Sequence, residues 1–129
     1  MEYTDLLNKP FKSGGRGPEY YDCLGLLIEL YRRQNILLED IDIEVGQEEK
    51  ASQILSDILS KPTWKQIYEP EVFCLVLIRQ HPVFISHLGI YLNEGKFIHA
   101  SYNGVIVERL SDPHYLKRIH GFYKYNRSY

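Results

Sequence analysis

Several features that define whole classes of protein are scarce in this sequence. Only two cysteines, Cys23 and Cys74, occur among the 129 residues; two are too few for a disulfide scaffold, and no CxxC pair indicates a zinc site. No apolar run approaches the length that spans a bilayer, so membrane insertion is not expected. The formal net charge is −2, and without a basic excess a nucleic-acid partner is not expected.

The length and the amino-terminal residues narrow the architecture further. A chain of 129 residues with 44% hydrophobic and 25% charged residues has room for one domain with one core, so a single domain is expected over residues 1–129. The first residues, MEYTD, are neither basic nor apolar, unlike a signal peptide. We therefore expect synthesis in the cytoplasm without a signal peptide, so that work outside the cell requires another carrier.

The hydrophobic pattern changes along the chain from a helical period to a strand period. Helices are predicted at residues 3–8, 23–34 and 48–60. Strands of period two or of continuous apolar character are predicted at residues 72–79, 87–92, 96–101, 105–110 and 121–125, with a further short strand at 41–45. Helices followed by an antiparallel meander indicate an α+β fold.

Cys23 stands at a place where a thiol can become a nucleophile. It follows a glycine-rich loop (residues 12–18) and opens a predicted helix, with Asp22 as the expected N-cap. The positive end of the helix dipole favours the thiolate, whereas the charge of Asp22 opposes it. A lone cysteine also fits a small buried apolar position, and the sequence leaves both interpretations open. Cys74 lies inside an apolar strand and is expected in the core.

Two histidines fall on neighbouring strands of a predicted hairpin. His87 and Gly89 share one face of the first strand, and His99 lies on the second. If Gly89 pairs with His99, the two histidines are diagonal neighbours whose side chains can meet, whereas a one-residue slip sends His99 to the opposite face. Gly89 would also leave the space above the sheet open for a third group.

A cysteine with two histidines supplies a nucleophile, a base and an orienting group. In this arrangement His87 takes the proton of the Cys23 thiol, and His99 bonds the far nitrogen of His87 and fixes its tautomer. The same three side chains also suit zinc, but they lack the usual local ligand spacing and an evident acidic fourth ligand. No metal or organic cofactor is therefore expected.

Three segments together resemble the NlpC-type cell-wall cysteine peptidases. Residues 10–15 with 22–26 are similar to the nucleophile region of that family, 87–91 to its base-bearing strand, and 97–100 to the strand that carries its third polar residue. The resemblance extends over nearly the whole chain. It implies a reduced papain-like α+β fold, in which N-terminal helices, the nucleophile helix among them, pack on an antiparallel sheet of about five strands.

The resemblance also implies an activity and a substrate. Members of the family hydrolyse peptide bonds in the stem peptides of bacterial peptidoglycan, commonly between D-glutamate and diaminopimelate, so the implied place of action is the cell wall. Cys23, His87 and His99 carry over as nucleophile, base and orienting residue. No metal or cofactor is implied.

Within the family, the phage-tail branch is the most similar. The similarity lies in residues 14–18, 105–110 and 121–125. It implies that phage-tail proteins are further partners and that the chain acts at the cell wall as part of a tail.

Two positions depart from the pattern of many members. Phe11 stands where they have a tyrosine near the site, and Leu24 where they have a serine that helps to bind the stem peptide; with Asp22, these positions are expected to bind substrate. Both changes remove a polar group. A second hypothesis is therefore a tail-tip structural or assembly module with a peptide-binding groove and little or no catalysis. A third is acyl or thioester chemistry on another substrate; a lipid substrate is disfavoured because lipid-acting relatives of this fold tend to place histidine before cysteine.

Overall fold

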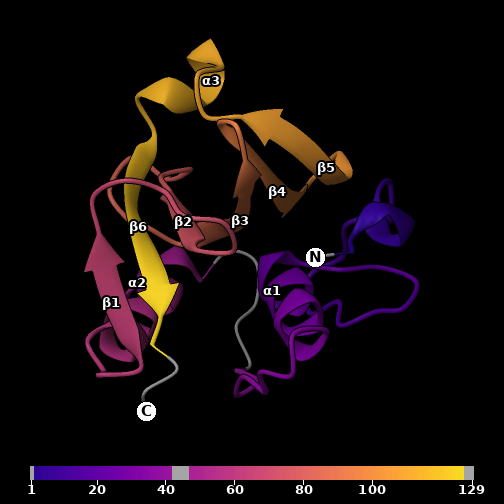
Figure 1. The fold of residues 1–129 in the computed structure, drawn as a ribbon, viewed down its shortest axis with the longest axis horizontal. Helices are drawn as coiled ribbons and strands as arrows, with labels where there is room; N and C mark the ends of the chain where they lie inside the picture. The colour runs from indigo at the N-terminus through magenta and orange to yellow at the C-terminus, as the bar shows by residue number, and fades with distance from the viewer. Residues whose placement is uncertain (1, 42–46, 127–129) are drawn as a thin grey trace.

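The computed structural model of the chain describes residues 2–41 and 47–126. Its helical elements are a short 3₁₀ helix at Thr4–Leu6, α1 at Cys23–Arg32, α2 at Glu48–Leu59 and α3 at Pro113–Leu116. The strands are β1 at Trp64–Ile67, β2 at Leu75–Ile78, β3 at His87–Asn93, β4 at Lys96–Ser101, β5 at Gly104–Arg109 and β6 at Ile119–Tyr125 (Figure 1). None of the described helices is long and apolar enough to cross a membrane.

The six strands within the described residues form one antiparallel sheet in the order β1-β6-β2-β3-β4-β5. This sheet with its helices confirms the predicted α+β class. The prediction of about five strands omitted β1, in which Trp64 is buried but Lys65 and Gln66 are exposed. Such a pattern carries no strand signal, and β1 exists because it pairs with β6. The strand predicted at 41–45 falls on a segment outside the described residues.

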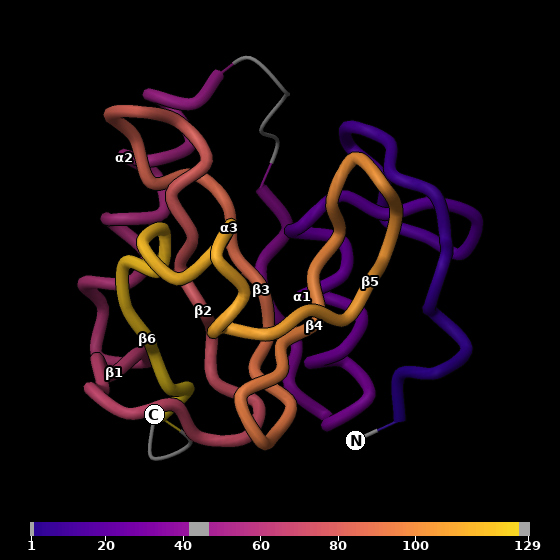
Figure 2. The backbone as a smooth tube through the Cα atoms, turned by 90° about the horizontal axis from the view of Figure 1, so that it is seen from above, coloured from indigo at the N-terminus to yellow at the C-terminus, as the bar shows by residue number. Residues whose placement is uncertain are grey.

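Both faces of the central strands are covered. On one face, α1 and α2 pack over a core that includes Leu88 and Ile98. On the other face, Tyr115 of α3 closes a second, smaller core with Phe97 and Cys74. Cys74 is 2% exposed, which confirms its predicted place in the core. Figures 1 and 2 show α1 beside β3 and β4, with α2 near β1.

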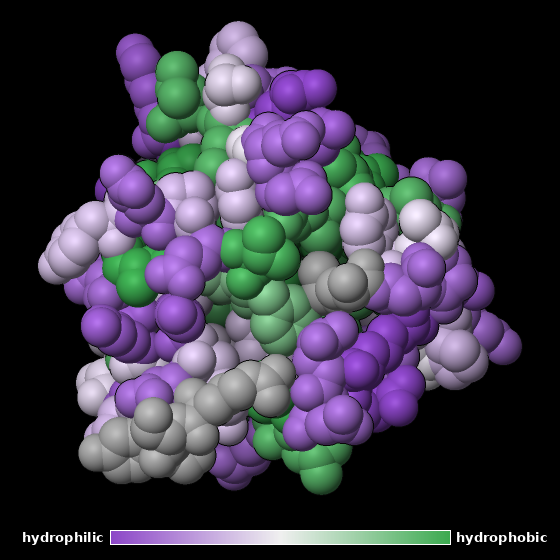
Figure 3. Space-filling view, viewed as in Figure 1, coloured by the Kyte–Doolittle hydropathy of each residue, from purple (hydrophilic) through white to green (hydrophobic). Residues whose placement is uncertain are grey.

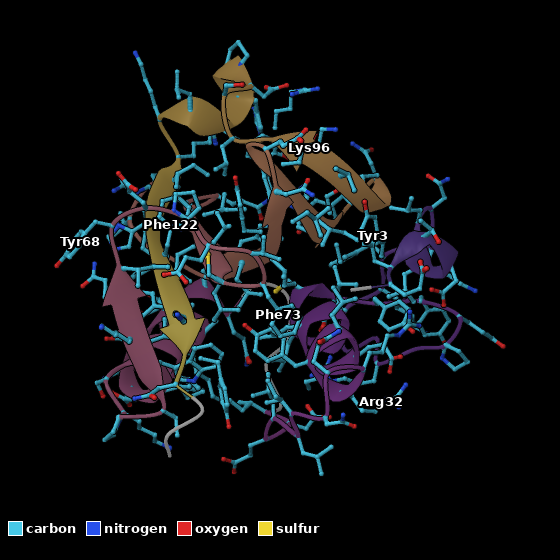
Figure 4. All side chains as sticks on the ribbon, viewed as in Figure 1. Tyr3, Arg32, Tyr68, Phe73, Lys96 and Phe122 are labelled. Atoms are coloured by element: carbon cyan, nitrogen blue, oxygen red, sulfur yellow. The ribbon has the colours of Figure 1, made fainter. Side chains whose placement is uncertain are left out.

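A cluster of aromatic rings holds α1 against the sheet. Tyr31, near the end of α1, stacks on Phe73 with 4.0 Å between ring centroids, and its hydroxyl donates to the Phe73 carbonyl at 2.7 Å. Tyr125 of β6 meets Tyr31 and Trp64 edge-on. Figure 4 shows Phe73 beside α1, whereas Tyr68 points away from the molecule and is 85% exposed. Since α1 begins at Cys23, these contacts also fix where the thiol lies.

One face of the molecule has an apolar centre. Figure 3 shows hydrophobic side chains gathered at the centre of this face, with hydrophilic side chains around them. The ring of Phe73 belongs to the partly buried hydrophobic groups that pack against the larger core. The helix that carries Cys23 is therefore held by apolar burial along its length rather than by its capping residue alone.

Candidate active site

Asp22 sets the start of α1 and so the position of Cys23. Its Oδ1 accepts the N–H of Gly25 at 2.7 Å, as expected for an N-cap. Its Oδ2 accepts the N–H of Gly14 at 3.0 Å, and Arg16 donates to Oδ1 at 2.8 Å. One carboxylate therefore ties the glycine-rich loop to the first turn of the helix, which confirms the predicted capping role.

Gly25 lets the same loop lie directly on the first turn of α1. A Cβ added to Gly25 would come within 2.0 Å of the Gly15 carbonyl oxygen. Glycine inside a helix ordinarily costs stability relative to alanine. Here the close approach of the loop backbone leaves no room for any side chain, so this glycine serves the placement of Cys23.

The two histidines of the predicted hairpin meet. In the pairing of β3 with β4, Ile90 lies opposite Ile98 and Tyr91 opposite Phe97. When this register is continued by one residue, His99 lies opposite Gly89. His87 Nε2 lies 2.8 Å from His99 Nδ1. The diagonal histidine pair that the sequence permits is thus formed.

The space beside Gly89 is filled, contrary to the prediction that it stays open for a third group. A Cβ at Gly89 would lie 2.9 Å from the ring of Phe97 and 3.2 Å from the Cβ of His99. The reason is that this face carries the second core, which the sequence pattern did not indicate. The third group must approach His87 from the other side, at the start of β3.

A groove of about 400 Å³ brings most of the predicted site residues together. Five of the six line it: Phe11, Asp22, Cys23, Leu24 and His87. The sixth, His99, is fully buried behind His87. The backbone N–H of Leu88, the residue that follows His87, lowers the pKa of the Cys23 thiol. Much of the remaining lining is apolar and comes from α2.

Burial controls the ionisation of the thiol and of the imidazole. It raises the pKa of Cys23 to about 11, and the negative charge of Asp22 adds to that rise. It also lowers the pKa of His87 to about 3, with His99 contributing. The opposing effect of Asp22 was expected, but burial is the larger cause of the rise. The resting pair is therefore a neutral thiol and a neutral imidazole, which can act as a general base when the thiol attacks.

Glu108 on β5 is a residue that the sequence reasoning missed. Its Oε2 is hydrogen-bonded to His99 Nε2. On β5, Glu108 pairs with Phe97 and Ile106 pairs with His99, so Glu108 is a diagonal neighbour of His99. The register of β4 and β5, in which Ser101 pairs with Gly104 across the turn, brings the two side chains together; the pattern of β5 alone gives no signal for this contact.

The alternative of a zinc site gains no support from this geometry. Among residues 2–41 and 47–126, no group of three or more histidine, cysteine, aspartate or glutamate side chains is arranged to hold an ion. His99 uses Nδ1 in its contact with His87 and Nε2 in its contact with Glu108. Neither ring nitrogen of His99 has a lone pair to spare for a metal.

Because the imidazole of His87 is buried, we expect the protein to lose stability in acid, and we expect a substitution of His87 to remove this loss. Above pH 6.5, the ordinary pKa of histidine, His87 is mostly unprotonated in both the folded and the unfolded protein. Below pH 6.5 the unfolded chain binds a proton at His87, whereas the folded protein binds it only when the pH falls to about 3. At pH 4 this lowers the free energy of unfolding by about 3 kcal/mol. His87→Gln lacks this loss. Urea unfolding of both proteins at pH 7 and pH 4 measures it, and equal losses in the two proteins would contradict it.

Comparison with known proteins gives one family and several similar structures. The model of a family described as the NlpC/P60 family matches residues 8–124. A probable peptidoglycan endopeptidase, LytE of Bacillus subtilis, is 28% identical over 116 residues, which are 90% of this chain and 30% of LytE.

Two solved structures of NlpC/P60 family proteins have a similar fold. One, from Staphylococcus aureus and described as similar to lipoprotein, has a TM-score of 0.69 at 20% identity and covers 93% of this chain and 37% of that protein. The other, from Bacillus cereus, has a TM-score of 0.66 at 17% identity and covers 93% of this chain and 36% of that protein. The chain thus spans about a third of the length of these relatives.

Proposed function

Because the chain belongs to the NlpC/P60 family, we propose that it is a cysteine peptidase that hydrolyses peptide bonds in the stem peptides of bacterial peptidoglycan. The observation that carries this proposal is the groove in which Cys23 and His87 lie together, with His99 bonded to the far nitrogen of His87. The similarity to LytE, a probable peptidoglycan endopeptidase, supports the choice of substrate. Residues 1–129 would act as one domain.

The proposed reaction has two steps. The Cys23 sulfur attacks the carbonyl carbon of the scissile peptide bond while its proton passes to His87. The oxyanion that forms accepts the backbone N–H of Cys23, which at the first position of α1 has no partner within the helix. The C–N bond then breaks, and His87 gives its proton to the leaving amine. Water, deprotonated by His87, attacks the thioester and releases the carboxylate and the free thiol.

The bond that we propose is the one between D-glutamate and diaminopimelate, with Asp22, Phe11 and Leu24 contacting the substrate. Phe11 and Leu24 support this placement because both line the groove beside Cys23. Phe11 also packs against Tyr102, with 4.9 Å between ring centroids. Action at the cell wall follows from the proposed substrate, whereas association with a phage tail rests on the sequence resemblance alone.

Purified peptidoglycan incubated with the protein tests the proposed function. We expect soluble stem-peptide fragments and new free amines, full inhibition by iodoacetamide, and no inhibition by a chelator, since the thiol and not a metal activates the reaction. Peptidoglycan that binds the protein but yields no new amines would instead support the binding module. Inhibition by the chelator alone would contradict a thiol mechanism.

A further inference from the structure

We propose that Glu108 is a positioning residue that fixes the proton positions on His99 and His87, so that one nitrogen of His87 stays free to accept the thiol proton. The role rests on the function proposed above, because it matters for catalysis only if Cys23 reacts through His87. Glu108 is not among the residues that line the groove. It acts on the reaction through His99 and not by contact with substrate.

The network behind His87 joins three elements of the fold. His99 of β4 has Nδ1 2.8 Å from His87 Nε2, and its Nε2 is hydrogen-bonded to Oε2 of Glu108 on β5. The hydroxyl of Tyr115 on α3 lies 3.4 Å from His99 Nε2, and Glu108 raises the pKa of that hydroxyl. His99 is 0% exposed. Both of its ring nitrogens therefore have protein partners, and water does not compete for them.

The chemistry of these partners determines where each proton lies. A carboxylate oxygen only accepts, so His99 carries its hydrogen on Nε2. Burial lowers the pKa of His99 although Glu108 opposes it, and burial lowers the pKa of His87 to about 3, so both rings are neutral at neutral pH. A neutral ring has one N–H, so His99 Nδ1 accepts and His87 Nε2 donates. The nitrogen of His87 that remains to take the thiol proton is Nδ1.

Without the carboxylate, this order of protons can reverse. His99 could then hold its hydrogen on Nδ1 and donate to His87, while the Tyr115 hydroxyl donates to the bare Nε2 of His99. His87 would carry its own hydrogen on Nδ1, which could no longer accept the proton of Cys23. Glu108 also supplies a negative charge that stabilises the His87 imidazolium formed during attack, across the ring of His99.

Other charged groups lie around the network but do not fill this role. His114 lowers the pKa of His99 through its charge. Asp112 raises and Arg118 lowers the pKa of Tyr115 in the same way. Among the charged side chains of the described residues, Glu108 alone is hydrogen-bonded to the neutral ring of His99. The proton order of the two rings therefore depends on this carboxylate.

The first experiment measures the tautomers directly and needs no activity. Long-range ¹H–¹⁵N correlation of histidine-labelled Cys23→Ala protein at pH 7 is expected to show His87 and His99 both as Nε2–H tautomers. Adding Glu108→Ala is expected to move a large share of His87 to the Nδ1–H tautomer, while exposed His120 stays unchanged as an internal reference. His99 found as Nδ1–H, or identical spectra for the two proteins, would overturn the proposal.

The second experiment separates positioning from substrate binding. Glu108→Ala is expected to lower kcat about 10- to 100-fold with KM changed less than about twofold. The rate at which iodoacetamide alkylates Cys23 at pH 7 should fall by a similar factor, and its pH profile should move to higher pH. Glu108→Gln keeps an acceptor oxygen and should recover part of both. Glu71→Gln removes a carboxylate whose side chain is 51% exposed and should change neither.

The two measurements also distinguish failure of this role from failure of the proposed function. If the unsubstituted protein does not hydrolyse peptidoglycan, the tautomers and the alkylation rate still decide what Glu108 does. An alkylation rate and pH profile that Glu108→Ala leaves unchanged, or a change in KM alone, would contradict the role even in a protein that is fully active.

Discussion

Cys23→Ala is expected to lower hydrolysis of peptidoglycan at least about 10⁴-fold, because it removes the atom that forms the acyl intermediate. The fold should survive, since Cys23 is half-buried in the wall of the groove and the helix cap comes from Asp22. Release of free amines from purified peptidoglycan measures the activity, and circular dichroism with urea unfolding measures the fold.

Cys74→Ala is the matched control for this substitution. Cys74 is 2% exposed in the second core, so alanine there should cost about 1–3 kcal/mol of stability by leaving a small cavity. It should leave the activity of the folded protein nearly unchanged. The two substitutions are thus predicted to have opposite outcomes. Cys23→Ala loses activity and keeps stability, whereas Cys74→Ala loses stability and keeps activity. A Cys23→Ala protein that hydrolyses peptidoglycan as fast as the unsubstituted one would contradict the assignment of Cys23 as the nucleophile.

His87→Gln is expected to lower kcat about 10²- to 10⁴-fold, the range for loss of a general base. Glutamine keeps a donor towards His99 but cannot take the thiol proton. Because the pKa of Cys23 is raised to about 11, few molecules would hold a thiolate at pH 7 without that base. Alkylation of Cys23 should therefore slow as well.

His120→Gln provides the comparison, because His120 is exposed on β6 and lies outside the groove lining. Its kcat and its alkylation rate should equal those of the unsubstituted protein. If His87→Gln retains full activity, or if His120→Gln loses as much as His87→Gln does, His87 is not the base.

The parts of the fold that the sequence predicted best are those in which local rules and burial agree. The helix at Cys23–Arg32 begins where Asp22 indicated a cap, and β4 has the predicted bounds Lys96–Ser101. The hairpin of β3 and β4 pairs His99 next to His87 because a tight turn and a buried apolar face leave one register.

The parts that the sequence did not predict depend on tertiary pairing. β1 has one buried residue and forms because β6 offers a partner edge. The second core appears only when α3 brings Tyr115 over Phe97, which puts the histidine face of the sheet inside the protein and not at its surface. That burial explains why the pKa of His99 is lowered although Glu108 opposes it. The pKa of Cys23 is raised by burial on the opposite face, where Cys23 packs against the larger core.

Glu108 illustrates the same point within the site. A pair of carboxylates can be recognised in a sequence by their spacing, whereas Glu108 is the partner of a histidine on the next strand. Its role depends on the register of β4 and β5, so a single strand pattern does not reveal it. The candidate site was therefore predicted up to its third member, and its fourth needed the fold.

Mass spectrometry of muropeptides after incubation with the protein tests the central claim most directly. The predicted result is that stem peptides are split at one peptide bond, each cleavage adding the mass of one water, with D-glutamate at the new carboxyl end and diaminopimelate at the new amino end. The Cys23→Ala protein should leave the same muropeptides intact. Muropeptides that remain unchanged with the unsubstituted protein, or that are cleaved equally by Cys23→Ala, would contradict the account.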